Sequence, residues 1–181
     1  MIVPVVVVTL SGTNPDVQRD LDATNEIFGR EAGVFFEIAA RLEVDAPELN
    51  TLSQEDCNGV GHVVSDEEDQ LFSLGRNLGA DLVAYYIGGS SFGSNVLGCA
   101  AHPADRRGFW VVANSSFDFI FAHEATHVIG DNNHERDDTT NLMYPYANEV
   151  TDLPPDLNLA QVRRILDDPA LLSVESIVLN L

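Results

Sequence analysis

The segment HEATHVIGDNNH, from His123 to His134, carries the strongest pattern in this chain. Residues four apart on a helix leave the same face one turn apart, so His123 and His127 are expected to project side by side. Apolar residues flank them and predict that the helix is internal: Phe117, Ile120, Phe121, Val128 and Ile129. A helix that carries two histidines by coincidence is the alternative, but buried polar side chains need partners. We therefore expect a metal-binding helix that begins after Ser115 or Ser116 as its cap and ends at Gly130.

The chemistry of these side chains indicates zinc. Imidazole nitrogens bind Zn²⁺ at about 2.0–2.1 Å, and both histidines could reach one ion. Glu124 would lie beside the ion rather than on it, where it can take a proton from a zinc-bound water as a general base. Gly130 can adopt a left-handed conformation that turns the chain back, which could bring His134 to the metal. Three protein ligands and a water would form an open, catalytic site.

The same run resembles the metzincin metallopeptidase signature HExxHxxGxxH. Downstream, the sequence NLMYP at 141–145 resembles the Met-turn of that clan, in which a methionine, here Met143, packs beneath the zinc ligands. The resemblance is strong over residues 115–146 and compatible elsewhere. It implies Zn²⁺, endopeptidase activity and a zincin-like α/β (α+β) fold. That fold has a twisted, mixed, five-stranded-type sheet with two covering helices, an active-site helix and a small C-terminal subdomain ending in a helix.

The chain departs from this signature at the third ligand. The pattern places that ligand three residues after Gly130, at Asn133, whereas His134 follows one residue later and gives HExxHxxGxxxH. An amide oxygen is a poorer zinc ligand than an imidazole. A loop that is one residue longer costs little. We therefore predict that His134 is the ligand, with Asn133 and then Asp131 as the alternatives.

A second departure concerns a tyrosine. Some metzincin families use a tyrosine two residues after the Met-turn methionine to stabilise the oxyanion, and this position is Pro145. Tyr144 and Tyr146 flank it, and we predict packing roles for both.

Patterns outside the segment predict an α/β layer arrangement, with a mixed sheet covered by two helices. Apolar or alternating runs predict strands over residues 3–10, 34–44, 81–87 and 108–114. Start and stop signals predict three further helices. The first begins at Asn14 and ends at Gly33, and the second begins at Ser65, with Glu68 as its capping-box partner, and ends near Gly79. The third covers residues 157–166. We expect one catalytic domain, 1–181. Its N-terminal subdomain would be 1–130, including the active-site helix, and its C-terminal subdomain 131–181, with the Met-turn and the final helix.

Charge and cysteine content restrict the partners and the compartment. The 29 acidic and 9 basic residues give a net charge of −20, which repels nucleic acid and anionic membranes. The excess of acidic residues fits either adaptation to high salt or a generally acidic secreted protein. No segment approaches the roughly 18 to 20 apolar residues of a membrane span. Cys57 and Cys99 fit one disulfide of an exported protein, or two separate buried thiols. We expect a secreted monomer whose signal peptide or pro-segment is not in this chain.

These features together predict a zinc metalloendopeptidase. Its protein or peptide substrate would lie extended along an edge strand formed by residues 95–101. The pocket for the residue after the cut would be walled by the active-site helix and residues 144–147. The alternatives are a zinc-dependent amidase acting on non-protein or cell-wall substrates, and an inactive binding module with the metzincin fold. Weaker metal candidates are His62 and His102, and Ca²⁺ at Asp137–Asp138 or Asp66–Asp69.

Overall fold

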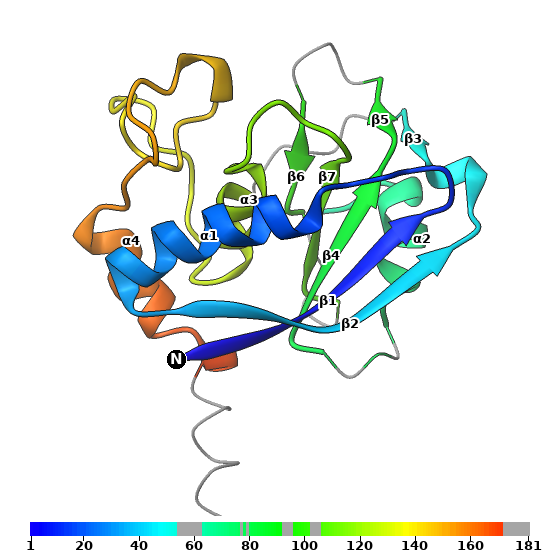
Figure 1. Ribbon diagram of the computed structural model, residues 1–181, viewed down its shortest axis with the longest axis horizontal. Coiled ribbons are helices and arrows are strands. Elements are labelled where there is room, and N and C mark those ends of the chain that lie inside the picture. Colours follow the sequence, from blue (N-terminus) through cyan, green and yellow to red (C-terminus); the bar gives the residue numbers. More distant parts are fainter. Residues whose placement is uncertain (54–62, 77, 79, 92–95, 102–105, 172–181) are drawn as a thin grey trace, which may run out of the picture.

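The computed structural model describes residues 1–171, apart from 54–62, 77, 79, 92–95 and 102–105. A five-stranded sheet with the order β2-β1-β4-β7-β6 forms its centre (Figure 1). The first four strands run parallel, and β6 at the edge runs antiparallel to β7. The predicted mixed α/β sheet is therefore confirmed. The strands are β1 (Ile2–Leu10), β2 (Phe35–Val44), β4 (Leu82–Ile87), β6 (Gly98–Cys99) and β7 (Gly108–Val112).

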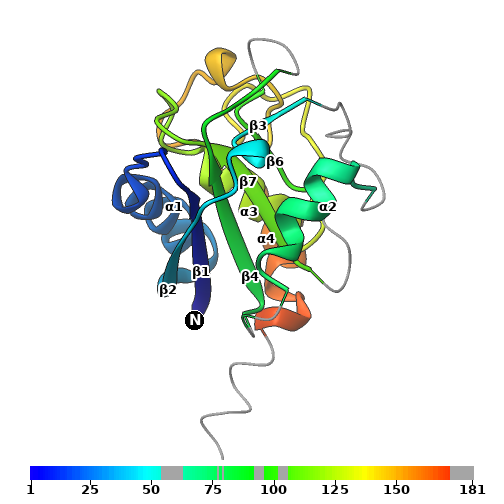
Figure 2. The same ribbon diagram turned by 90° about the vertical axis from the view of Figure 1, so that its right-hand side faces the viewer.

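Helices cover both faces of this sheet. Figure 2 shows α1 (Val17–Ala32) and α2 (Asp66–Ser73) on opposite sides. Successive side chains of a strand point to opposite faces, so the valine run of β1 contributes to two cores. One core contains Val5 and Val7 together with residues of α1 and α3 (Ile120–Val128). The other contains Val6 and Val8 together with residues of α2. The run of valines therefore makes β1 a strand buried on both faces.

The helix starts follow local hydrogen bonds, and two of the predicted caps are wrong. The side chain of Asp16, rather than Asn14, accepts from Arg19 N and caps α1. Helix α3 begins after Phe119 without a side-chain cap, because the Ser115 hydroxyl accepts from Phe117 N and closes a local turn instead. The capping box of Ser65 and Glu68 is confirmed, although α2 ends at Ser73 rather than near Gly79.

The chain after α3 returns to the sheet through a long loop and a final helix. Helix α4 (Leu159–Leu166) is capped by Asn158 and packs on the turn at Gly130. A Cβ at Gly130 would lie 2.7 Å from main-chain atoms of Arg164 and Ile165, and its φ is 85°. Glycine is therefore required here by both conformation and space. The division into subdomains at residue 130 stays a prediction.

Short elements complete the described part of the chain. They are the 3₁₀ helices η1 (Pro47–Leu49) and η2 (Ala147–Glu149) and a parallel pair of strands, β3 (Thr51–Leu52) and β5 (Gly89–Ser90). None of the helices in the described residues combines the length and the apolar character that a bilayer crossing requires.

Candidate metal centre

Three imidazole rings converge at the C-terminal half of α3. The Nε2 atom of His134 lies 3.3 Å from Nε2 of His123 and 3.3 Å from Nε2 of His127. One ligand atom from each of the three residues lies within 4.8 Å of the others. Their exposure increases along the chain, from buried His123 through half-buried His127 to exposed His134. The centre therefore has a closed inner wall and an open outer side.

Main-chain carbonyl groups fix the tautomers of the two helical histidines. His123 Nδ1 lies 2.7 Å from the carbonyl oxygen of Leu142, and His127 Nδ1 lies 2.6 Å from that of Asn132. A carbonyl oxygen can only accept, so each Nδ1 carries the proton and donates it. Each Nε2 therefore keeps its lone pair and directs it into the cluster. This is the outer-shell arrangement that orients histidine ligands of metals.

The spacing of the nitrogen atoms fits a tetrahedral zinc ion. Ligand nitrogens at about 2.0–2.1 Å from a tetrahedral ion lie about 3.3–3.4 Å from each other. The two Nε2 separations of 3.3 Å match that edge length. Three neutral imidazoles whose Nε2 lone pairs point into one space also offer a set of donor atoms for a cation. The donor set therefore suits Zn²⁺.

Two successive left-handed residues bring His134 to this position. Gly130 has φ 85° and Asp131 has φ 48°, so the chain reverses directly after the helix. The buried Asn132 then donates its side-chain amide to the carbonyl groups of Thr126 and Ile129, at 3.3 and 3.4 Å. The extra residue between Gly130 and His134 is thus accommodated within this turn.

Of the three alternatives for the third ligand, the structure brings His134 to the histidine cluster. Asn133 and Asp131 are both exposed, and Asp131 is not a member of the converging group. Zinc ligation by His134 stays a prediction, which the geometry favours.

Glu124 lies in the interior beside the cluster. The residue is 6% exposed and belongs to the middle of α3. Burial raises the pKa of its carboxyl well above the usual range, because a buried carboxylate loses its hydration. Its side chain faces the edge strand: a Cβ built on Gly98 would lie 2.7 Å from Glu124 Oε1. The predicted general base therefore lies between the histidines' helix and β6.

Burial also favours the neutral forms of His123 and His134. It lowers the pKa of His123 well below its usual range, and the neighbouring His127 and His134 lower it further. Burial, with His127 and Arg136, lowers the pKa of His134 to about 4. Neutral imidazole is the form that binds a metal, so these rings are ready for ligation at neutral pH.

The segment predicted to form the Met-turn is buried against α3. Met143 is fully buried in the same core as α3, as is Leu142, whose carbonyl accepts from His123. The buried side chain of Asn141 accepts from Met143 N at 2.9 Å and exchanges two hydrogen bonds of 3.0 Å with Gln161. The turn is therefore attached to α4 on one side and to a histidine on the other.

The tyrosines that follow the Met-turn form a surface pair. Tyr144 and Tyr146 stack edge to face with ring centroids 6.0 Å apart, and the Tyr144 hydroxyl donates to Glu149. This contact supplies the packing role that the sequence predicted.

Sequence reasoning missed the carbonyl groups of Leu142 and Asn132, the amide pair of Asn141 and Gln161, and the contact between Gly98 and Glu124. Main-chain carbonyls have no sequence signature, so nothing could have indicated the first two. A polar Asn141 within an apolar turn is a signal that could have pointed to a buried partner.

The other residues that the sequence singled out are not part of the histidine cluster. Cys99 is buried and disulfide-bonded, while its predicted partner Cys57 lies outside the described residues, as do His62 and His102. Within the part of the chain that the structure describes, His123, His127 and His134 are the group of metal-binding side chains that converges. The acidic runs at 66–69 and 137–138 form no such group there, so Ca²⁺ is not supported.

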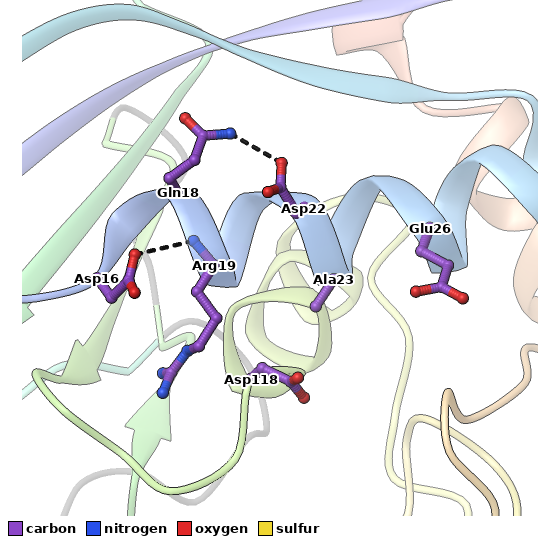
Figure 3. A pocket seen from close by; sticks show the side chains of 7 residues that line it. All are labelled: Asp16, Gln18, Arg19, Asp22, Ala23, Glu26 and Asp118. Carbon is purple, nitrogen blue, oxygen red and sulfur yellow. Dashed lines mark hydrogen bonds between the residues drawn. The ribbon is translucent and has the colours of Figure 1, made fainter.

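A separate surface groove of about 500 Å³ follows α1 (Figure 3). Its carboxylates include Asp16 and Asp22, which accept hydrogen bonds from Arg19 N and the Gln18 side chain. The groove is lined by Asp16, Gln18, Arg19, Asp22, Ala23, Glu26 and Asp118. It shares no residue with the histidine cluster and is a solvated acidic face.

Comparisons with known proteins identify the fold. No protein-family model and no curated protein match the chain. A structure of a chaperone–substrate complex is similar with a TM-score of 0.56 and 12% identity, over 94% of this chain and 34% of that one, so the match spans about a third of it. The crystal structure of archaemetzincin from Methanopyrus kandleri is similar with a TM-score of 0.57 and 16% identity, over 90% of this chain and 93% of that one. The chain therefore has the zincin-like fold that archaemetzincin has.

Proposed function

We propose that this protein is a zinc-dependent endopeptidase. The observation that carries the proposal is the convergence of three histidine Nε2 atoms beside a buried glutamate and an antiparallel edge strand. His123, His127 and His134 would hold the ion. The fold of archaemetzincin supports a metal-dependent hydrolase of this architecture.

Each residue of the site has a separate task in this proposal. Zinc held by the three imidazoles would supply Lewis acidity, which lowers the pKa of water and polarises a carbonyl oxygen. Glu124 would accept the proton of the attacking water and later deliver it to the leaving amine. The raised pKa of Glu124 suits this task, because the carboxyl group must both take up and release a proton.

The substrate would bind as an extended chain along β6. This strand lies at the end of the sheet, where residues 95–101 were expected to form the edge, and residues 98–99 pair with β7. An extended peptide can add to such an edge through main-chain hydrogen bonds. Because Gly98 lies against Glu124, a peptide on this strand would pass close to the general base. This placement favours a peptide over a small amide substrate.

We further propose that the protein works outside the cell. The disulfide at Cys99 supports this compartment, because such bonds persist in oxidising surroundings.

The test uses Glu124→Gln and Glu124→Ala. Each variant is expected to bind one zinc ion per chain, as measured by metal analysis. Each should lose about 10²–10⁴-fold in kcat on an unstructured protein substrate, because the general base is gone. Chelation of the metal should abolish the cleavage by the unchanged protein.

Full activity in either Glu124 variant would overturn the mechanism. Mass-spectrometric mapping of the cuts separates the alternatives. Cleavage of cell-wall fragments without cleavage of protein would indicate the amidase, and zinc binding without any hydrolysis would indicate the binding module.

A further inference from the structure

We propose that Gly98 is a positioning residue for Glu124. The absence of a side chain at this point of the edge strand would keep the carboxylate of Glu124 between α3 and β6, in the position from which it would act as general base. This inference rests on the proposed function, because it assigns Gly98 a part in the same reaction.

The geometry leaves no room for a methyl group at residue 98. A Cβ built there would lie 2.7 Å from Glu124 Cγ, 2.7 Å from Oε1 and 3.0 Å from Cδ. Real Cβ atoms essentially never approach other heavy atoms below about 3 Å, so one of the two residues would have to move. The contact includes Cγ near the root of the side chain. Relief would therefore require rotation of the whole Glu124 side chain, which would displace its carboxylate.

Position 98 requires glycine because there is no space for a side chain, and not because of its backbone conformation. Gly12, Gly33 and Gly130 have a positive φ that disfavours other residues, and Gly98 is not among them. An alanine could adopt the conformation of Gly98. The three heavy atoms nearest to its methyl group would all belong to Glu124, so the substitution chiefly tests this contact.

The two main chains on either side of this contact are fixed. Next to Gly98, Cys99 is 1% exposed and disulfide-bonded, and Leu97 accepts a hydrogen bond of 2.8 Å from Val112 N. On the other side, the neighbours of Glu124 in α3 include Ala122 and Ala125, both fully buried. Neither β6 nor α3 can withdraw cheaply from a close-packed interior. The side chain of Glu124 is thus the part that gives way.

The first experiment compares Gly98→Ala with Gly89→Ala. Gly98→Ala should keep one zinc per chain and a KM within a few-fold, but lose about 100-fold in kcat, because a misplacement of about 1 Å costs this much. Gly89, in the short strand β5, is the matched control. A Cβ on Gly89 would meet nothing within 4 Å, so Gly89→Ala should leave zinc, KM and kcat unchanged.

A double-mutant cycle then asks whether Gly98 acts through Glu124. Gly98→Ala should lower the Tm by several degrees because of overpacking. In the Glu124→Ala background the space is vacant, so the same substitution should leave the Tm unchanged. A glycine needed only for the strand itself would lower the Tm equally in both backgrounds.

The outcomes separate this inference from the proposed function. Full kcat in Gly98→Ala, or an equal loss of Tm in both backgrounds, overturns the positioning role while zinc-dependent cleavage by the unchanged protein stands. If the unchanged protein binds no zinc or cleaves nothing, the proposed function fails, and the Tm cycle still determines whether Gly98 acts on Glu124.

Discussion

At the scale of single residues, the turn after α3 is one residue longer than in the metzincin signature. Its extra residue moves Asn133 to the surface and His134 into the cluster, where the Nε2 atom lies 3.3 Å from both partners. Asp131 makes this possible by adopting φ 48°, which aspartate tolerates better than most residues. A single left-handed residue beyond Gly130 therefore determines which side chain faces the other histidines.

Separate substitution of the two neighbouring residues tests this assignment. His134→Ala is expected to weaken zinc binding by more than about 100-fold, because loss of a ligand should exceed the 10–100-fold cost of losing an outer-shell partner. Asn133→Ala is the matched control, one residue away and exposed, and should bind zinc normally. Competition titration with a chromophoric chelator measures both. Loss of zinc in Asn133→Ala alone would show that the ligand assignment is wrong.

At the scale of elements, α4 is linked to the segment 141–143 by hydrogen bonds between side chains. Gln161 is the capping-box residue of α4 and also exchanges two hydrogen bonds with Asn141. The Asn141 side chain accepts a hydrogen bond from Met143 N. The carbonyl of the intervening Leu142 accepts one from His123 Nδ1. The start of α4 is thus connected to the first histidine by a short series of buried hydrogen bonds.

Gln161→Met tests this connection. The substitution keeps the volume but leaves the side-chain amide of buried Asn141 without its partner, so the free energy of unfolding should fall by about 1–3 kcal/mol. Zinc affinity should fall as well, because the Met-turn loses its attachment. Gln18→Met, on the exposed face of α1, is the control and should stay within about 0.5 kcal/mol. Chemical denaturation and zinc titration give the two quantities; equal values for both variants would contradict the connection.

At the scale of the whole molecule, the dominant property is charge. A net charge of −20 on 181 residues places like charges close together over the surface, and their mutual repulsion opposes the compact state. The groove along α1 is a local example, because its lining includes four carboxyl groups and one arginine (Figure 3). The folded state must therefore be stable despite this electrostatic repulsion.

Salt should therefore stabilise the protein. Raising NaCl from about 0.1 M to 1 M shortens the screening length from about 10 Å to about 3 Å, so the Tm should increase by several degrees. Calorimetry of the chelator-treated protein measures this without a contribution from metal. KCl should act equally, since screening depends on ionic strength. A constant or falling Tm would show that surface repulsion contributes little to the stability.

The sequence alone specified those features that depend on near neighbours. The valine run of β1, the Ser65–Glu68 capping box and the i, i+4 pair of His123 and His127 each involve residues within a few positions of one another. Their patterns were sufficient to predict a buried strand, a helix start and a shared helix face. The clan resemblance extended this to the zincin-like fold, which the likeness to archaemetzincin confirms.

Only the tertiary structure determined which distant groups meet. Gly98 lies against Glu124, Asn141 pairs with Gln161, and the Leu142 carbonyl accepts a hydrogen bond from His123, although each pair is separated by about twenty residues or more. No local pattern specifies such contacts, because they depend on how the sheet, α3 and α4 pack together. The same packing places His134 beside His123 and His127. A helix pattern thus predicts that His123 and His127 share one face, while the position of His134 depends on the fold.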